Sequence, residues 1–267
     1  MSAHPRFAIL ALAFPLALGI VSQRAAAQVA DFRARLDSLF TLLDRNQRTM
    51  GAITIRKSGR ILYQRTIGFR DSATSGWLPS DDETTFRVGS VTKPLTAVLI
   101  YQLVEERRLS LDTKLSPYFP QIPGSDSITI RDLLGHTSGL TDYAQGMDVM
   151  VPLDRAALLR RISAQPLQFP PGTQRRYSNS NYLLLGYVVE AVTRSTYDEQ
   201  LQRRIVNRVG LRSTHLGGAV APAANDSRAY YFNDGHWEPQ PDHVIQNAGA
   251  AGGVISTSLD LTLFLSA

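Results

Sequence analysis

The segment GAITIRKSGRILYQRTIGF at residues 51–69 restricts the possible fold more than any other part of the chain. Two short runs rich in isoleucine, threonine and tyrosine flank the turn Lys57-Ser58-Gly59-Arg60, a pattern that predicts a β-hairpin. A hairpin alone is unstable in water, because its edges and one face need partners. The rest of the chain must therefore cover this hairpin with helices or add strands to it.

Most of the remaining chain predicts helices, and no convincing strand follows the hairpin. Apolar residues at helical spacing predict helices at 29–48, 90–108, 130–134, 155–163 and 181–193, and from about residue 258. A glycine-rich bend, NAGAAGGVIS, precedes the last of them. The expected class is α/β of the α+β type.

The first 27 residues are expected to be a secretory signal peptide. An apolar run at 7–21 is interrupted by Pro15, and three alanines before Gln28 supply a processing site, with cleavage after Ala27. The run is too short and too interrupted to span a membrane. We therefore expect a periplasmic or secreted protein without a stable membrane span, the alternative being that these residues form a buried N-terminal helix.

Charge and composition exclude several classes of partner. Loss of Arg6 and Arg24 with the signal peptide lowers the basic residues from 28 to 26, against 23 acidic residues, a net charge of +3. Arginine pairs are dispersed, which is typical of a solvated surface and not of a nucleic-acid site. The chain has no cysteine and its histidines lack ligand-type spacing, so no disulfide, metal or other cofactor is expected.

Ser90 and Lys93 form a Ser-x-x-Lys group at the start of the helix predicted for 90–108. Only three of the 28 basic residues are lysine, and Lys93 is one of them. Residues three apart share a helix face, and a lysine, unlike an arginine, can lose its proton when buried. The two residues are therefore either a nucleophile with its base or a helix cap with a surface lysine.

Three further segments occur with this group: LLGHTSGLTDY at 133–143, Tyr177-Ser178-Asn179, and STSLDL at 256–261. With them the chain resembles the serine β-lactamase and penicillin-binding protein superfamily over essentially all of its mature length. The closest likeness is to the branch of class C β-lactamases, D-alanyl-D-alanine carboxypeptidases and related esterases. In that branch Tyr-x-Asn replaces the Ser-Asp-Asn motif of other members.

The resemblance implies a role for each of four residues. Ser90 would be the acylated nucleophile and an oxyanion donor through its N–H, and Lys93 its proton-sharing partner. Tyr177 would be the second acid/base group, and Asn179 would bind the substrate's amide and orient Lys93. The alternatives are a packing role for Tyr177 and an N-cap role for Asn179. His136 is expected to fix a loop and to take no part in catalysis.

The implied activity is that of an exported serine hydrolase acting through an acyl-enzyme. Its substrates would be small molecules or peptides, namely β-lactams, D-Ala-D-Ala-type peptides or esters. The alternative is a non-catalytic penicillin-recognition or interaction module that has kept the fold.

The family's third motif, a lysine or histidine followed by serine or threonine and glycine on a late strand, is not found. Lys57-Ser58-Gly59 is no substitute, because it precedes Ser90 in the hairpin turn. The chain is therefore expected to be the N-terminal part of a longer enzyme, without the late sheet strands. The expected layout is the N-terminal helix and first hairpin at 28–88, a mainly helical subdomain at 89–247, and the start of the return to the sheet at 248–267.

Overall fold

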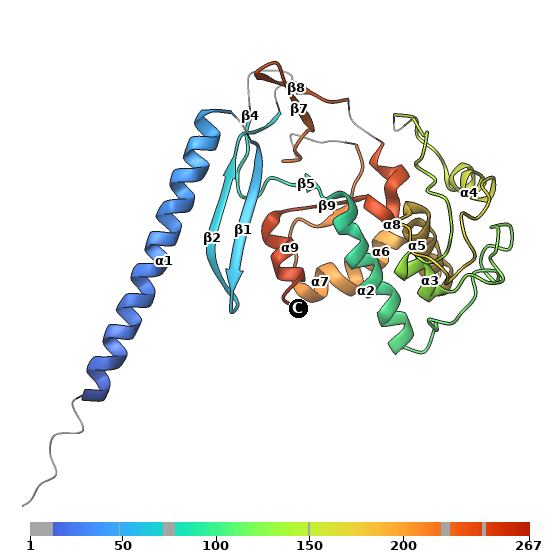
Figure 1. Cartoon of the computed structure of the whole chain (residues 1–267), viewed down its shortest axis with the longest axis horizontal. Helices are drawn as coiled ribbons and strands as arrows, with labels where there is room; N and C mark the ends of the chain where they lie inside the picture. Colours follow the sequence, from blue (N-terminus) through green and yellow to red (C-terminus); the bar gives the residue numbers. More distant parts are fainter. Residues whose placement is uncertain (1–12, 48, 72–77, 149, 220–224, 242–243) are drawn as a thin grey trace, which may run out of the picture.

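The computed structural model describes residues 13–47, 49–71, 78–148, 150–219, 225–241 and 244–267. Helix α1 (Ala13–Arg45) lies beside a two-stranded sheet, and the other helices lie on the opposite side of that sheet (Figure 1). Residues 1–12 of the expected signal peptide lie outside the described residues, whereas its remaining residues belong to α1. The helix expected at 29–48 is thus the C-terminal part of a longer helix.

The predicted hairpin is confirmed. Strands β1 (Gly51–Lys57) and β2 (Arg60–Ile67) pair antiparallel. In the turn, Ser58 and Gly59 have φ angles of 49° and 77°. These are the left-handed values that a two-residue hairpin turn requires.

Helices lie against both faces of this hairpin. Successive side chains of a strand point to opposite faces, so different residues of the hairpin contact the helices on each face. On one face, the hydroxyl of Tyr63 in β2 donates to Asp37 Oδ1 of α1 at 2.9 Å. On the other face, Thr54 Oγ1 of β1 lies 2.8 Å from Ser258 Oγ of helix α9 (Ser258–Phe264). Within the described residues the sheet remains two-stranded, so helices provide the cover that the hairpin requires.

The expectation that no convincing strand follows the hairpin is wrong. Short strands occur at β3 (Phe69–Asp71), β4 (Leu78–Pro79), β5 (Phe86–Arg87), β6 (His215–Leu216), β7 (Tyr230–Asn233), β8 (His236–Pro239) and β9 (Val254–Ser256). They are two to four residues long, too short for a period-two pattern to be recognised. The β7–β8 hairpin did offer a signal, because Asp234-Gly235 connects its strands.

A three-stranded sheet fixes the start of helix α2 (Thr92–Glu105). Strand β9 lies between β5 and β6 and pairs antiparallel with both. Val88 N donates to Val254 O, and Val254 N donates to Thr92 Oγ1, each at 3.1 Å. These bonds hold the chain on both sides of residues 89–91, which form a 3-10 turn before α2.

Apart from the helix expected at 29–48, which begins much earlier, the predicted helices are confirmed with small shifts at their ends. Besides α1, α2 and α9, the helices are α3 (Ile130–Gly135), α4 (Arg155–Ser163), α5 (Asn179–Thr193), α6 (Tyr197–Leu201), α7 (Asn207–Val209) and α8 (Gly249–Gly252), with a π-helical turn at Gln202–Val206. Helices α2 and α5 supply the centre of the core with fully buried side chains, among them Leu99, Ile100, Leu103, Leu184 and Val188.

Helix α8 packs against α5 at a glycine. A Cβ atom added at Gly186 would lie 2.3 Å from the Cβ of Ala250, well inside the optimal separation of about 3.5–4.0 Å between carbon atoms. The absence of a side chain at this position of α5 therefore sets how closely α8 approaches.

Replacing Gly186 by alanine is expected to push α8 away from α5 and to lower the free energy of unfolding by about 1–3 kcal/mol, the usual effect of overpacking. Urea denaturation measures the loss. Gly135→Ala is the matched control in α3, since its added Cβ would meet only Thr137, at 3.7 Å or more. Equal losses in the two variants would contradict the role given to the α5–α8 contact.

Candidate active site

Ser90 lies in the 3-10 turn before α2 and is exposed to solvent. It follows Gly89, whose φ of 53° is a left-handed value that favours glycine. One helical turn later, the side chain of Lys93 is buried, and the residue is only 5% exposed. The structure therefore places an accessible hydroxyl beside a desolvated amine, with the spacing that the sequence predicts.

Lys93 Nζ has three oxygen partners. It lies 3.0 Å from Ser90 Oγ, 2.9 Å from Asn179 Oδ1 and 2.6 Å from the carbonyl oxygen of Ala251. The amide and carbonyl oxygens can only accept, so a neutral amine would donate its two protons to them and turn its lone pair toward Ser90. A protonated amine would donate to all three oxygens. The geometry fits both forms, and Ser90 is the partner whose role changes between them.

Tyr177 reaches Ser90 from the residues just before α5. Its hydroxyl lies 2.6 Å from Ser90 Oγ and 3.3 Å from Asn179 Oδ1. Lys93 Nζ lies 4.8 Å from the centre of its ring, a cation–π distance. Tyr177 is 51% exposed, so it is not a residue of the core, although its ring contacts that of His136.

Asn179 is the first residue of α5, and Ser178 takes the N-cap position. The alternative that Asn179 caps the helix is therefore wrong. Its amide oxygen faces Lys93, and its amide nitrogen donates to Asp142 Oδ2 at 2.9 Å. The side chain thus connects Lys93 to the loop that carries Asp142.

His136 occupies a structural position, as the sequence predicts. Its ring contacts those of Tyr177 and Tyr182 in a tilted arrangement, with centroid distances of 4.7 and 5.2 Å. Its Nδ1 accepts a hydrogen bond from Ser178 N at 3.3 Å. At φ 58° it ends α3 in the left-handed conformation, which histidine adopts more readily than most residues. Through the ring contact, His136 supports the ring of Tyr177.

A cavity of about 320 Å³ lies beside Ser90, and Ser90 and Asn179 are among its lining residues. Most of its other lining side chains are apolar or small. These residues are Arg87, Gly89, Tyr143, Ala144, Met147, Val244, Ile245, Asn247, Ala248, Ala251 and Gly252. A cavity of this size and character suits a small, mainly apolar part of a substrate.

Two partners in the site are not among the residues that the sequence predicts. One is the carbonyl of Ala251, because a backbone oxygen carries no residue-specific signal. The other is Asp142, which bonds Asn179. Asp142 lies within LLGHTSGLTDY, one of the segments on which the family resemblance rests. A polar residue in that segment was the signal from which a role in the site could have been predicted.

Comparison with known proteins identifies the family. The family model described as Beta-lactamase matches residues 30–267, and the chain therefore belongs to the beta-lactamase family. It is 32% identical over 231 residues to Esterase EstB of Burkholderia gladioli, which covers 79% of this chain and 57% of that protein. It is 25% identical over 211 residues to the Teichoic acid D-alanine hydrolase of Staphylococcus aureus, with coverages of 79% and 52%.

A solved structure shows the same fold. The penicillin binding protein from Bacillus halodurans matches with a TM-score of 0.70 and 27% sequence identity, covering 85% of this chain and 71% of that one. The mixed architecture of helices and small antiparallel sheets is thus the β-lactamase/transpeptidase fold. The chain spans about half the length of the curated relatives it matches, 45% to 57% in the first four.

Among the described residues we find no helix with the length and apolar character that a membrane crossing would require.

The protonation of His136 links the site to stability. Burial lowers its pKa below the ordinary value of 6.5, and the charges of Lys93 and Arg175 lower it further, whereas the charge of Asp142 acts in the opposite direction. The unfolded chain therefore binds a proton more readily than the folded one. Stability is lost as the pH falls from about 6.5 toward the folded-state pKa.

We expect His136→Asn to reduce this acid destabilisation, because asparagine keeps an acceptor for Ser178 N and tolerates the left-handed backbone but does not titrate. The measurement is the thermal unfolding midpoint as a function of pH from neutral to about pH 5. His236→Asn, a change at an exposed histidine of β8, is the matched control and should not reduce the effect. An unchanged pH slope in His136→Asn would assign the destabilisation to other groups.

Proposed function

We propose that this chain is an exported serine hydrolase that acts through an acyl-enzyme formed on Ser90. The observation that carries the proposal is the position of Ser90 Oγ, 3.0 Å from Lys93 Nζ and 2.6 Å from the hydroxyl of Tyr177. A serine becomes a strong nucleophile when a neighbouring group accepts its proton. Membership of the beta-lactamase family supports the same assignment.

In the proposed acylation, the proton of the Ser90 hydroxyl moves to the lone pair of neutral Lys93 while Oγ bonds to the substrate's carbonyl carbon. The negative charge that develops on the carbonyl oxygen is stabilised by the N–H of Ser90 and by the N-terminus of α2. The bond to the leaving group then breaks, and the leaving group takes one proton from the hydroxyl of Tyr177, which the proton held by Lys93 replaces. The acyl group remains as an ester of Ser90.

Water completes the proposed cycle. It adds to the carbonyl carbon of the ester and gives a proton to the same acid/base pair. The acyl–oxygen bond breaks, the carboxylic acid leaves, and the hydroxyl of Ser90 is restored. Asn179 uses one amide proton to bond Asp142, so its second amide proton is the one that would bind the substrate.

The proposed substrates are esters, β-lactams and D-Ala-D-Ala-type peptides, which share an electrophilic carbonyl group. The relatives include an esterase, a D-alanine hydrolase and a penicillin binding protein. The largely apolar cavity beside Ser90 supports an acyl portion of modest size.

Export is proposed from the N-terminal sequence, with cleavage after Ala27. The contacts of α1 with β2 support it, because they involve residues on the mature side of that position. Arg33 donates to Leu62 O, and Arg65 donates to Asp37 O and to Thr41 Oγ1. A chain that begins at Gln28 would keep these bonds.

The proposed base is tested by replacing Lys93 with arginine, which keeps the charge but cannot accept the proton of Ser90. We expect the rate of acylation to fall by about a hundredfold or more. The assay incubates the protein with a labelled penicillin or a p-nitrophenyl ester and follows the mass increase of the intact chain. Lys114→Arg is the matched control, since Lys114 is exposed and its amine donates to a backbone oxygen, Ser127 O, at 3.2 Å.

Ser90→Ala is expected to abolish the adduct. Labelling that survives in Ser90→Ala would remove the nucleophile from the proposal. Normal acylation of Lys93→Arg would remove the base. A wild-type chain that forms no adduct with either reagent would point to the non-catalytic binding module instead.

A further inference from the structure

The amide of Asn179 meets two groups of different chemistry. Its oxygen accepts from Lys93 Nζ at 2.9 Å, and its nitrogen donates to Asp142 Oδ2 at 2.9 Å. The two ends of a primary amide have nearly the same shape, so shape alone does not decide which end faces the lysine. A carboxylate accepts and cannot donate. Asp142 therefore accommodates the amide nitrogen and rejects the amide oxygen.

We propose that Asp142 is a positioning residue that holds the amide of Asn179 with its oxygen toward Lys93. This inference rests on the proposed function. Neutral Lys93 has two N–H groups, which the oxygens of Asn179 and Ala251 occupy, and its lone pair is left for the proton of Ser90.

A reversed amide would remove this arrangement. Its NH2 group would face the nitrogen of Lys93 and would donate into the lone pair that Ser90 needs. If Lys93 were protonated, the NH2 group of the reversed Asn179 amide would face the ammonium group, and no hydrogen bond could form between two donors. Either state opposes removal of the proton from Ser90, so the orientation of Asn179 affects the acylation step itself.

Asp142 is itself held firmly, as a positioning residue must be. Its Oδ1 accepts from Ala144 N at 3.0 Å. The next residue, Tyr143, donates from its backbone N to Ser180 Oγ at 2.9 Å and from its hydroxyl to Asn247 O at 2.6 Å. Three separate contacts thus hold Asp142 and the residue that follows it.

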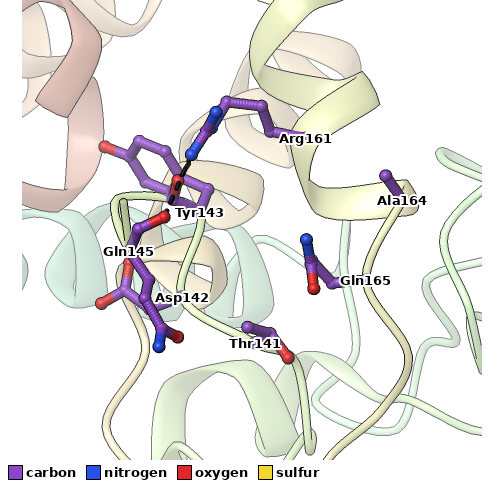
Figure 2. A pocket seen from close by; sticks show the side chains of 7 residues that line it. All are labelled: Thr141, Asp142, Tyr143, Gln145, Arg161, Ala164 and Gln165. Atoms are coloured by element: carbon purple, nitrogen blue, oxygen red, sulfur yellow. Dashed lines mark hydrogen bonds between the residues drawn. The ribbon is translucent and has the colours of Figure 1, made fainter. Parts of the chain in front are cut away.

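A fourth contact comes from α4 (Figure 2). Arg161 donates to the carbonyl oxygens of Tyr143 and Gln145, each at 3.1 Å. Asp142 and Arg161 line the same cavity, of about 340 Å³. Asp142 therefore lines this cavity and bonds Asn179 from a loop that several hydrogen bonds hold in place.

Asp142→Asn is the sharpest test, because it preserves size and changes the hydrogen bonding. The two carboxylate oxygens accept from Ala144 N and Asn179 Nδ2, and an asparagine has only one oxygen with which to accept. If that oxygen keeps the bond from Ala144, its NH2 group faces Asn179 and favours the reversed amide. We expect the acylation rate at saturating p-nitrophenyl ester to fall about tenfold or more, since small misplacements in a site have effects of this size.

The matched control is Asp148→Asn. Asp148 accepts from the backbone N two residues on, Met150 N at 2.9 Å, as Asp142 does from Ala144 N, but it is exposed and belongs to another turn. We expect this variant to acylate as the wild type does. In Asp142→Asn, the ester concentration that gives half-maximal rate should change less than the rate itself, and the thermal unfolding midpoint should stay near that of Asp148→Asn. A purely structural role would lower the midpoint and leave the acylation rate of the folded fraction unchanged.

The outcomes separate the two proposals. Equal acylation of wild type and Asp142→Asn would overturn the positioning role and leave the proposed function intact. Absence of an adduct in the wild type would overturn both. If Asp142→Asn changed only the ester concentration that gives half-maximal rate, the positioning role would also be overturned. Asp142 would then be a substrate-binding residue.

Discussion

The hydrogen bonding of one buried amine is the constraint on which the rest of the structure depends. A charged or neutral lysine nitrogen removed from water requires polar partners, and Lys93 finds them on three separate elements. The 3-10 turn carries Ser90, α5 carries Asn179, and α8 carries the carbonyl of Ala251. Packing of α2 against α5 and α8 is therefore the same event as assembly of the site. This explains why Gly186, which lies in the interior of α5 and has no direct role in the chemistry, affects the position of the Lys93 amine.

Much of the fold could be predicted from the sequence where its signals are long. The hairpin at 51–67 and the helices α2, α4 and α5 each extend over enough residues for a turn signal or an apolar repeat to show. The strands of two to four residues could not be recognised in this way, because they exist through tertiary pairing and not through local preference. Strand β9 is the clearest case: its three residues become a central strand only when β5 and β6 flank it. The connection of β7 to β8 was within reach, since Asp234-Gly235 is a strong hairpin sequence.

The candidate site also has parts that the sequence predicts and parts that it does not. Ser90, Lys93, Tyr177 and Asn179 were found from their spacing and from the family resemblance, and the structure brings their polar atoms together. The parts that were not found are a group without a side-chain signature and a residue to which no motif assigned a role. The carbonyl of Ala251 is the first, and Asp142, which lies within LLGHTSGLTDY, is the second. Residue types thus identify the groups that can exchange protons, whereas the structure is needed to identify the groups that orient them.

The partners of Lys93 lie far from it in the sequence, and this separation affects the properties of the chain before it folds. Asn179 and Ala251 lie 86 and 158 residues away from Lys93, so both contacts close long loops and carry a substantial entropic cost. Contacts of this kind tend to form slowly compared with local helices. During synthesis, before these contacts form, the hydroxyl of Ser90 is then an ordinary alcohol and the side chain of Lys93 is surrounded by water. The activation proposed for Ser90 would then appear only at the last stage of folding, so an incompletely folded chain would not react with substrates.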